Sequence, residues 1–330
     1  MSAPTPVCLL RREYKASVLL DEHPPVLRHP HKRLVFELSC PPGAVHAGNV
    51  ELTRWRALPL PETVQLSPTE VLVVPGFYDY SGDDAGVWHV NFADPQLFVA
   101  YGSALLAQDE LQAAEHPVLG SLREALLYEG LPAKTEVNDE PTPILVVGAE
   151  RRCAIATHPD RAAGRPRGLY GNLFAAASSS VIRAAVKVLR PPTRTNLIAM
   201  AAPTGGPGPY FRWQLERVLT TAYTAFSAAM TESRQLWPGR PVEIHTGFWG
   251  CGAFGGNRHA MTLLQLLSAR LAGVDRLRFH AGDDAGLAAF ETGSEDLDRV
   301  LAAGTPGEPL AELVERIGDL DYEWGVSDGN

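Results

Sequence analysis

The chain has 330 residues, 45% of them hydrophobic and 8% aromatic, so it can bury the core of one large domain or two small ones. Its formal net charge of −9 repels polyanions and therefore disfavours broad nucleic-acid binding through a basic surface. No apolar run approaches the ~20 residues of a membrane-spanning helix. Charged residues at positions 11–13 also interrupt the apolar stretch that an export signal needs. We therefore expect a cytoplasmic protein with no membrane partner.

The cysteines and histidines predict neither a disulfide framework nor a metal site. The four cysteines lie far apart and form no C-x-x-C pair; they are Cys8, Cys40, Cys153 and Cys251. A group of histidines, His23, His29 and His31, falls in a proline-rich stretch, where such side chains are usually solvated. We assign no metal and no cofactor to the chain.

Residues 1–65 are predicted to form an irregular N-terminal extension. Prolines interrupt every periodic stretch between positions 24 and 61, and only Arg33–Leu38 has the pattern of a strand.

From residue 66 onwards, short apolar runs alternate with amphipathic patterns. The runs typical of strands cover residues 71–74, 87–92, 144–147, 197–201, 242–245 and 277–280. The patterns typical of helices cover residues 104–127, 178–189, 212–230 and 258–272. This alternation predicts one three-layer α/β domain over residues 66–300. An acidic C-terminal tail follows, residues 301–330, with a short helix and a loose end.

The most informative segment joins the predicted strand at 242–245 to the predicted helix at 258–272. Five glycines lie within the ten residues 247–256, which is more than a tight turn needs. A glycine loop at a helix N-terminus presents several backbone N–H groups to one anion, and the helix dipole favours negative charge there. We predict a phosphate or diphosphate site in residues 246–256.

The same loop admits a second interpretation. Gly250, Gly252 and Gly255 satisfy the G-x-G-x-x-G pattern of dinucleotide-binding domains, between a strand and a helix as that pattern requires. An NAD-dependent oxidoreductase is therefore an alternative. Against it, the acidic residue needed at the end of the next strand would be Asp275, which precedes that strand.

The loop resembles the C-terminal signature of the poly(ADP-ribose) glycohydrolases. The family pattern is T-G-N-W-G-C-G-A-F-G-G-D, and Thr246–Asn257 reads T-G-F-W-G-C-G-A-F-G-G-N. The helix after it contains L-L-Q where the family has L-I-Q, and Arg278–Asp283 is similar to the family's strand ending in F-G-D.

Upstream motifs extend the resemblance to about residues 66–290. Val90–Asp94 resembles the family's V-D-F-A-N, and Gln108–Glu110 stands where the family has Q-E-E. Weaker similarities link Val146–Glu150 to I-T-G-T-E, Tyr170-Gly171 to T-G-Y-A and Thr220–Phe226 to L-N-K-A-Y-x-G-F. The chain is identified as a divergent member of this family. The resemblance implies a macrodomain, a three-layer α/β/α fold with a mixed central sheet that binds ADP-ribose at the carboxyl ends of its strands.

The resemblance also implies a hydrolase that cleaves a ribosyl glycosidic bond. Glu110 matches the family's catalytic acid, which protonates the departing oxygen and then activates water. Asp109, one methylene shorter than the family's glutamate, would hold a ribose hydroxyl. The other implied contacts to ADP-ribose are Gln108, Asp94, Phe98, Tyr80, Ser81, Tyr170, Phe248, Gly250, Gly252, Ala253, Phe254, Gly255 and Gly256. Within this set, residues 252–255 would surround the diphosphate, and Tyr80 and Ser81 would lie near the adenine.

Several positions depart from the family pattern. Phe98, Val99 and Ala100 replace three glycines that leave room for the distal ribose. Asparagines are replaced by Asp94 and Phe248, and the phenylalanine that stacks on adenine is replaced by Ala281. A retained diphosphate loop beside an altered ribose pocket indicates a change of substrate or a loss of catalysis. Two hypotheses therefore stand beside the oxidoreductase: a glycohydrolase acting on an ADP-ribosylated substrate, and a catalytically weak module that binds ADP-ribose.

Overall fold

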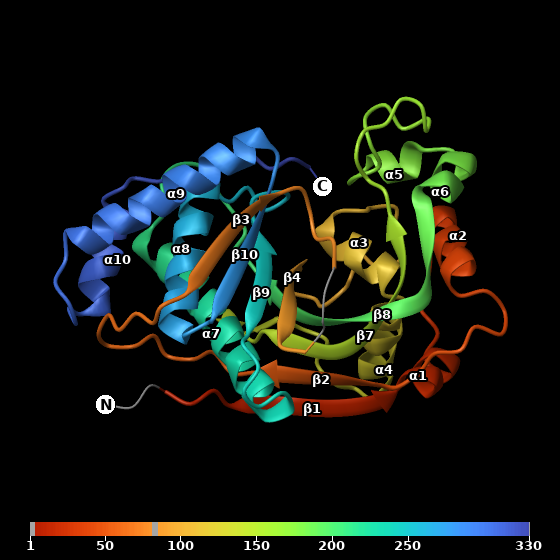
Figure 1. The fold of residues 1–330 in the computed structure, drawn as a ribbon, viewed down its shortest axis with the longest axis horizontal. Coiled ribbons are helices and arrows are strands. Elements are labelled where there is room, and N and C mark those ends of the chain that lie inside the picture. Colours follow the sequence, from red (N-terminus) through yellow and green to blue (C-terminus); the bar gives the residue numbers. More distant parts are fainter. Residues whose placement is uncertain (1–3, 81–84, 330) are drawn as a thin grey trace.

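The computed structural model describes residues 4–80 and 85–329 (Figure 1). Its main sheet has the strand order β1-β2-β7-β8-β4-β9-β10-β3. The strands of this sheet are β1 Cys8–Lys15, β2 Asn49–Trp55, β3 Glu70–Pro75, β4 Val87–Ala93, β7 Ile144–Ile155, β8 Val186–Ala201, β9 Glu243–Gly247 and β10 Arg276–Gly282. Two further strands, β5 Glu136–Val137 and β6 Glu140–Pro141, form a separate hairpin. The pairs from β1 to β8 are antiparallel, and those from β8 to β3 are parallel. The predicted mixed sheet is confirmed.

Helices cover both faces of this sheet, as Figure 1 shows. They are α1 Ala16–Glu22, α2 Pro30–Ser39, α3 Gln108–Glu115, α4 Val118–Tyr128, α5 Leu173–Ala176, α6 Ser179–Ala185, α7 Arg212–Leu236, α8 Arg258–Ala272, α9 Asp284–Ala302 and α10 Leu310–Gly318. Successive residues of β8 point to opposite faces, so Ile198 and Met200 pack under α7 and α8 while Leu197 and Ala199 pack against α4. The predicted three-layer α/β/α architecture is therefore confirmed.

Most of the predicted elements between residues 71 and 280 are present. All the predicted strands occur, and the helices expected at 212–230 and 258–272 are α7 and α8. The segment 104–127 instead forms two helices that are separated at His116 and Pro117, because a proline has no N–H to continue the ladder. The segment 178–189 is helical only to Ala185, since Val186 begins β8.

The prediction of an irregular N-terminal extension is wrong. β1 pairs with β2 and β2 pairs with β7, so this stretch forms one edge of the main sheet. Arg33–Leu38, predicted as a strand, lies in α2. Pro30 occupies the first turn of that helix, where its missing N–H leaves nothing unpaired, and the His29 side chain caps the helix by accepting from the His31 N–H. The prolines in this stretch separate helices and strands, but they do not prevent helices and strands from forming.

The C-terminal end that was predicted to be loose packs on the domain as far as Gly325. The short helix is present as α10, and it buries Leu310, Leu313 and Ile317 in the core under α7 and α9. Beyond it, the Trp324 ring stacks on Tyr210 with ring centroids 4.0 Å apart, so this end is packed on the domain. None of the helices that the structure describes is long and apolar enough to cross a membrane.

Because β2 is part of the core, Leu52→Ala should lower the free energy of unfolding by about 2–5 kcal/mol, measured by urea denaturation. Leu52 is fully buried, and its truncation leaves a cavity beside α1 and α4. The matched control is Val45→Ala, at a side chain that is 78% exposed, which should change stability by less than about 0.5 kcal/mol. Equal effects of the two substitutions would contradict this placement of β2.

Candidate functional site

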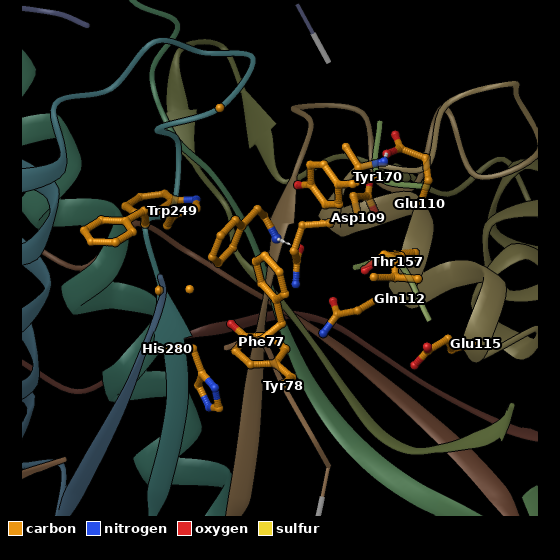
Figure 2. Close-up of a pocket in the computed structure, with 18 of the residues that line it drawn as sticks. Phe77, Tyr78, Asp109, Glu110, Gln112, Glu115, Thr157, Tyr170, Trp249 and His280 are labelled. Atoms are coloured by element: carbon orange, nitrogen blue, oxygen red, sulfur yellow. Dashed lines mark hydrogen bonds between the residues drawn. The ribbon is translucent and has the colours of Figure 1, made fainter. Parts of the chain in front are cut away.

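A cavity of about 1000 Å³ opens at the carboxyl ends of the parallel strands β3, β4, β9 and β10. One side is formed by the loop after β9, and the other by the start of α3. Figure 2 shows Trp249 on the first side, with Asp109, Glu110 and Tyr170 opposite it. The structure thus brings the predicted glycine loop and the predicted carboxylates to one cavity.

The loop after β9 is fixed by contacts beneath it. The Trp249 ring is fully buried and donates through Nε1 to the carbonyl oxygen of Met200 at 3.0 Å. The side chain of Gln265, from α8, donates through Nε2 to the carbonyl oxygen of Gly247 at 3.0 Å. Its Oε1 accepts a hydrogen bond from the Thr246 hydroxyl. Asn257 then begins α8 by accepting from the N–H groups of the first turn.

Two of the loop's glycines are explained by packing alone. Gly250 has φ +76°, and a side chain there would meet the Cβ of Ala202 at 2.5 Å. A Cβ at Gly256 would lie 2.8 Å from the carbonyl oxygen of Gly250. These steric needs do not apply to Gly252, which lines the cavity.

The loop also presents free hydrogen-bond donors. Within residues 4–80 and 85–329, the backbone N–H groups of Gly252, Ala253 and Phe254 donate to no other protein group. All three residues line the cavity. Adjacent unpaired N–H groups near a helix N-terminus suit the oxygens of a phosphate or diphosphate.

On the opposite side, α3 is fastened to the sheet through its first residue. The Gln108 side chain accepts from the Phe92 N–H at 2.7 Å and donates to the Val90 carbonyl at 3.1 Å. Gln108 lines the cavity, but both ends of its amide are engaged by β4. Its contribution is therefore to hold the two carboxyls that follow it.

Those two carboxyls are buried. Asp109 accepts a 3.0 Å hydrogen bond from the Asn91 side chain, and Glu110 accepts a 3.0 Å bond from the Ala107 N–H, which caps its own helix. Burial raises the pKa of Asp109, and the nearby Glu110 raises it further. Burial also raises the pKa of Glu110, against the opposing charge of Lys32. The pair therefore favours the protonated state that a general acid needs.

Lys32 is a residue of this site that the sequence analysis missed. It comes from α2, is 2% exposed, and donates through Nζ to the backbone carbonyl of Glu110 at 3.2 Å. Burial lowers the pKa of Lys32 to about 8, despite the attraction of the two carboxyls. The signal would have been a lone lysine on the apolar face of a helix, but residues 30–39 were not predicted as a helix.

Aromatic rings and His280 line another part of the cavity. Tyr80, predicted near the adenine, lies with the Arg151 guanidinium 4.2 Å from its ring centre, and its ring also contacts His89. Ser81, predicted beside it, falls outside the described residues. Tyr170 lines the cavity and its ring is parallel to that of Phe77, which is 68% exposed and was not predicted. An exposed aromatic ring at a cavity mouth is available to stack on a base.

Three of the predicted contact residues do not face the cavity. Phe98 is fully buried in the core with Leu97 and Leu122, so of the three bulky substitutions only Val99 and Ala100 reach the cavity. Gly255 and Gly256 lie on the side of the loop that faces away from the cavity. There the Gly255 carbonyl accepts from the Gly325 N–H, and Gly256 packs on Gly250. The reason is the chain reversal at Phe254, which turns the last two glycines towards the protein.

The other predicted contacts do line the cavity. Asp94 follows β4 and accepts from the Gln96 N–H at 2.7 Å, and Phe248 carries the Arg258 guanidinium 4.9 Å from its ring centre. Asp275, which a dinucleotide site would need, accepts from the Val242 N–H at 2.8 Å. This places Asp275 at the amino ends of β9 and β10, at the end of the sheet opposite the cavity, which disfavours the oxidoreductase interpretation.

Comparison with protein families identifies the segment that carries the loop. Residues 170–289 match the family model described as "Poly (ADP-ribose) glycohydrolase (PARG), Macro domain fold". This segment is similar to the catalytic domain of the poly(ADP-ribose) glycohydrolases. The match includes β9, the glycine loop, α8 and β10, so the family resemblance of the signature is confirmed. Gln108, Asp109 and Glu110 precede the matched residues, and their roles stay predictions.

Solved structures of bacterial poly(ADP-ribose) glycohydrolases are similar to most of the chain. The enzyme from Thermomonospora curvata is 17% identical, covers 86% of this chain and 85% of its own, and has a TM-score of 0.41. Its complex with the inhibitor ADP-HPD has the same identity, 17%, with 85% and 84% covered and a TM-score of 0.45. The enzyme from Deinococcus radiodurans in complex with ADP-ribose is 16% identical, with 87% and 95% covered and a TM-score of 0.42.

The buried histidines of this glycohydrolase-like domain predict a pH dependence of stability. Burial lowers the pKa of His280 to about 4, below its value of about 6.5 in the unfolded chain. Between these values the unfolded chain binds the proton and the folded protein does not, so the contribution of His280 is lost as the pH falls from 6.5 to 4. The raised carboxyl pKa values oppose this trend, so the effect must be isolated by substitution.

We expect the stability of His280→Asn relative to the parent protein to improve as the pH falls through that window, by up to about 1.4 kcal/mol per pH unit. Urea denaturation of both proteins at pH 7.5, 6.0 and 5.0 measures this difference. Between pH 7.5 and 8.5 it should not change, which serves as an internal control. A difference independent of pH throughout would contradict the assignment of a neutral, buried His280.

Proposed function

We propose that the chain is a hydrolase that cleaves the ribosyl glycosidic bond of an ADP-ribosylated molecule. The observation that carries this proposal is a single cavity lined both by the free N–H groups of residues 252–254 and by Asp109 and Glu110. The first group suits a diphosphate, and the second suits acid-assisted cleavage of a sugar bond. The family match of residues 170–289 supports the same ligand class.

In the proposed reaction, the loop holds the diphosphate and so directs the attached ribose towards α3. Protonated Glu110 gives its proton to the leaving oxygen as the bond from ribose C1 to that oxygen breaks. The resulting carboxylate then accepts a proton from a water molecule whose oxygen bonds to C1. Asp109, held by Asn91, is positioned to bind a ribose hydroxyl. Lys32 limits how far burial raises the pKa of Glu110, which lets the carboxyl serve in both steps.

The size of the site favours a single ADP-ribosyl unit as the substrate. Val99 and Ala100 line the cavity beside Asp94, where the family resemblance implies glycines. Their side chains narrow the space next to the distal ribose, where a further polymer unit would have to pass. We therefore propose a substrate with one ADP-ribose on a protein, nucleic acid or small molecule.

A catalytically weak ADP-ribose-binding module is the second candidate, and one observation favours it. Glu110 is only 5% exposed and one of its oxygens is already bound to the Ala107 N–H. A carboxyl used as a helix cap is less free to move a proton. Activity measurements on a Glu110 variant separate the two candidates.

Glu110→Gln should lower the release of ADP-ribose from a mono-ADP-ribosylated protein by about 10² to 10⁴, with the affinity for ADP-ribose nearly unchanged. The amide keeps the shape of the side chain but cannot supply the proton. On an aryl ADP-ribose, whose leaving group needs no proton, the loss should be smaller. The control is Glu291→Gln, at an exposed glutamate on α9, which should leave turnover unchanged. Unaltered turnover in Glu110→Gln would remove Glu110 from the mechanism.

A further inference from the structure

The last described residues of the chain cross the glycine loop. We name Tyr322–Gly329 the C-terminal strap. Its backbone makes four hydrogen bonds to the rest of the domain. Tyr322 O accepts from Tyr210 N–H and Trp324 N–H donates to Gly208 O, while Gly325 N–H donates to Gly255 O at 2.8 Å and Asp328 N–H donates to Gly252 O at 3.5 Å. In Figure 1 the C-terminal end lies between the sides of the molecule that carry α9 and α5.

The strap is anchored at its start through Trp324 and Glu323. The Trp324 ring stacks on Tyr210 and donates through Nε1 to the Gln214 side chain at 3.3 Å, and the Asn257 side chain donates to Glu323 O at 2.9 Å. Beyond Gly325, the Val326 side chain is 93% exposed. At the far end, the Asn172 side chain donates to Gly329 O at 2.9 Å, which links the strap to the segment that carries Tyr170.

The strap places a carboxylate at the loop. Asp328 lines the same cavity as the loop, and one of its carboxylate oxygens lies 3.2 Å from the position that a Cβ on Gly252 would take. Tyr170 lines the same cavity, and its pKa is raised to about 12 by burial, with a further contribution from the charge of Asp328. An anionic side chain therefore stands beside N–H groups that suit an anion.

We propose that the C-terminal strap is an internal competitor of the diphosphate, with the Asp328 carboxylate held where a ligand phosphate would bind. The inference rests on the proposed function, because it takes the loop as the diphosphate site. The Asp328 carboxylate lies beside those N–H donors without accepting from them, and a phosphate bound there would be repelled by its charge, so binding of ADP-ribose displaces residues 326–329. Trp324 stays stacked on Tyr210 and keeps the strap close enough to return when the product leaves.

The test is calorimetric titration of the full chain with ADP-ribose and, separately, with inorganic diphosphate. Asp328→Asn removes the charge and keeps the shape, and it should tighten both ligands by about tenfold, within the usual range of such couplings. The control is Asp319→Asn, which makes the same change of net charge at an exposed residue just after α10 and should change neither affinity. A chain that ends after Gly325 should match Asp328→Asn, because Trp324 is retained.

Each outcome decides between the two claims. If the parent protein binds ADP-ribose and Asp328→Asn and the shortened chain bind it no more tightly, the strap is not a competitor, and the proposed function stands. An equal gain of affinity in Asp319→Asn would also overturn the proposed role of the strap, because the effect would then come from the net charge. If none of the proteins binds ADP-ribose or diphosphate, the loop is not the diphosphate site, and the proposed function fails with it.

Discussion

The site depends on the hydrogen bonds between the buried Gln265 side chain and the end of β9. Through them α8 holds the last residues of the strand, so the chain must leave the sheet at Gly247 and enter the helix at Arg258 along one path. Gln108 fixes the start of α3 on the other side of the cavity, because both the oxygen and the nitrogen of its side-chain amide are hydrogen-bonded to β4. Two side-chain amides thus set the separation of the glycine loop and the carboxyls, since β4 and β9 are neighbours in the sheet.

This arrangement has an energetic cost. Asp109, Glu110 and Lys32 are all withdrawn from water, and burial opposes the charged form of each. A buried acid with a raised pKa is poorly suited to a stable core and well suited to proton transfer. Stability lost at such a site is supplied elsewhere, here by the apolar layers under α7 and α8.

Some of the fold and site follows from the sequence because the signals are local. The strand, glycine loop and helix at 242–272 are predicted by composition and periodicity over one continuous segment. The N-terminal strands were missed because β1 gains its order from pairing with β2, which a proline-rich sequence does not reveal. Lys32 and Asp328 were missed for the same reason: the tertiary fold brings Lys32 to Glu110 from 78 residues away, and Asp328 to Gly252 from 76 residues away.

The fate of Phe98 shows the limit of carrying a family pattern over residue by residue. The sequence analysis predicts that Phe98 replaces a glycine, and its backbone has φ +53°, a conformation that favours glycine. Yet the side chain turns into the core, and only Val99 and Ala100 reach the cavity. Alignment gives the place of the backbone, whereas packing decides where the side chain points.

The central claim is that the glycine loop and α3 form one site for ADP-ribose. Titration calorimetry of the unmodified chain with ADP-ribose, ADP and NAD tests it most directly. ADP lacks the second ribose of ADP-ribose, which would reach α3. The account therefore predicts one site that binds ADP-ribose at least about tenfold more tightly than ADP, a difference of about 1.4 kcal/mol. Equal affinities for ADP-ribose and ADP, or tight binding of NAD without binding of ADP-ribose, would contradict it.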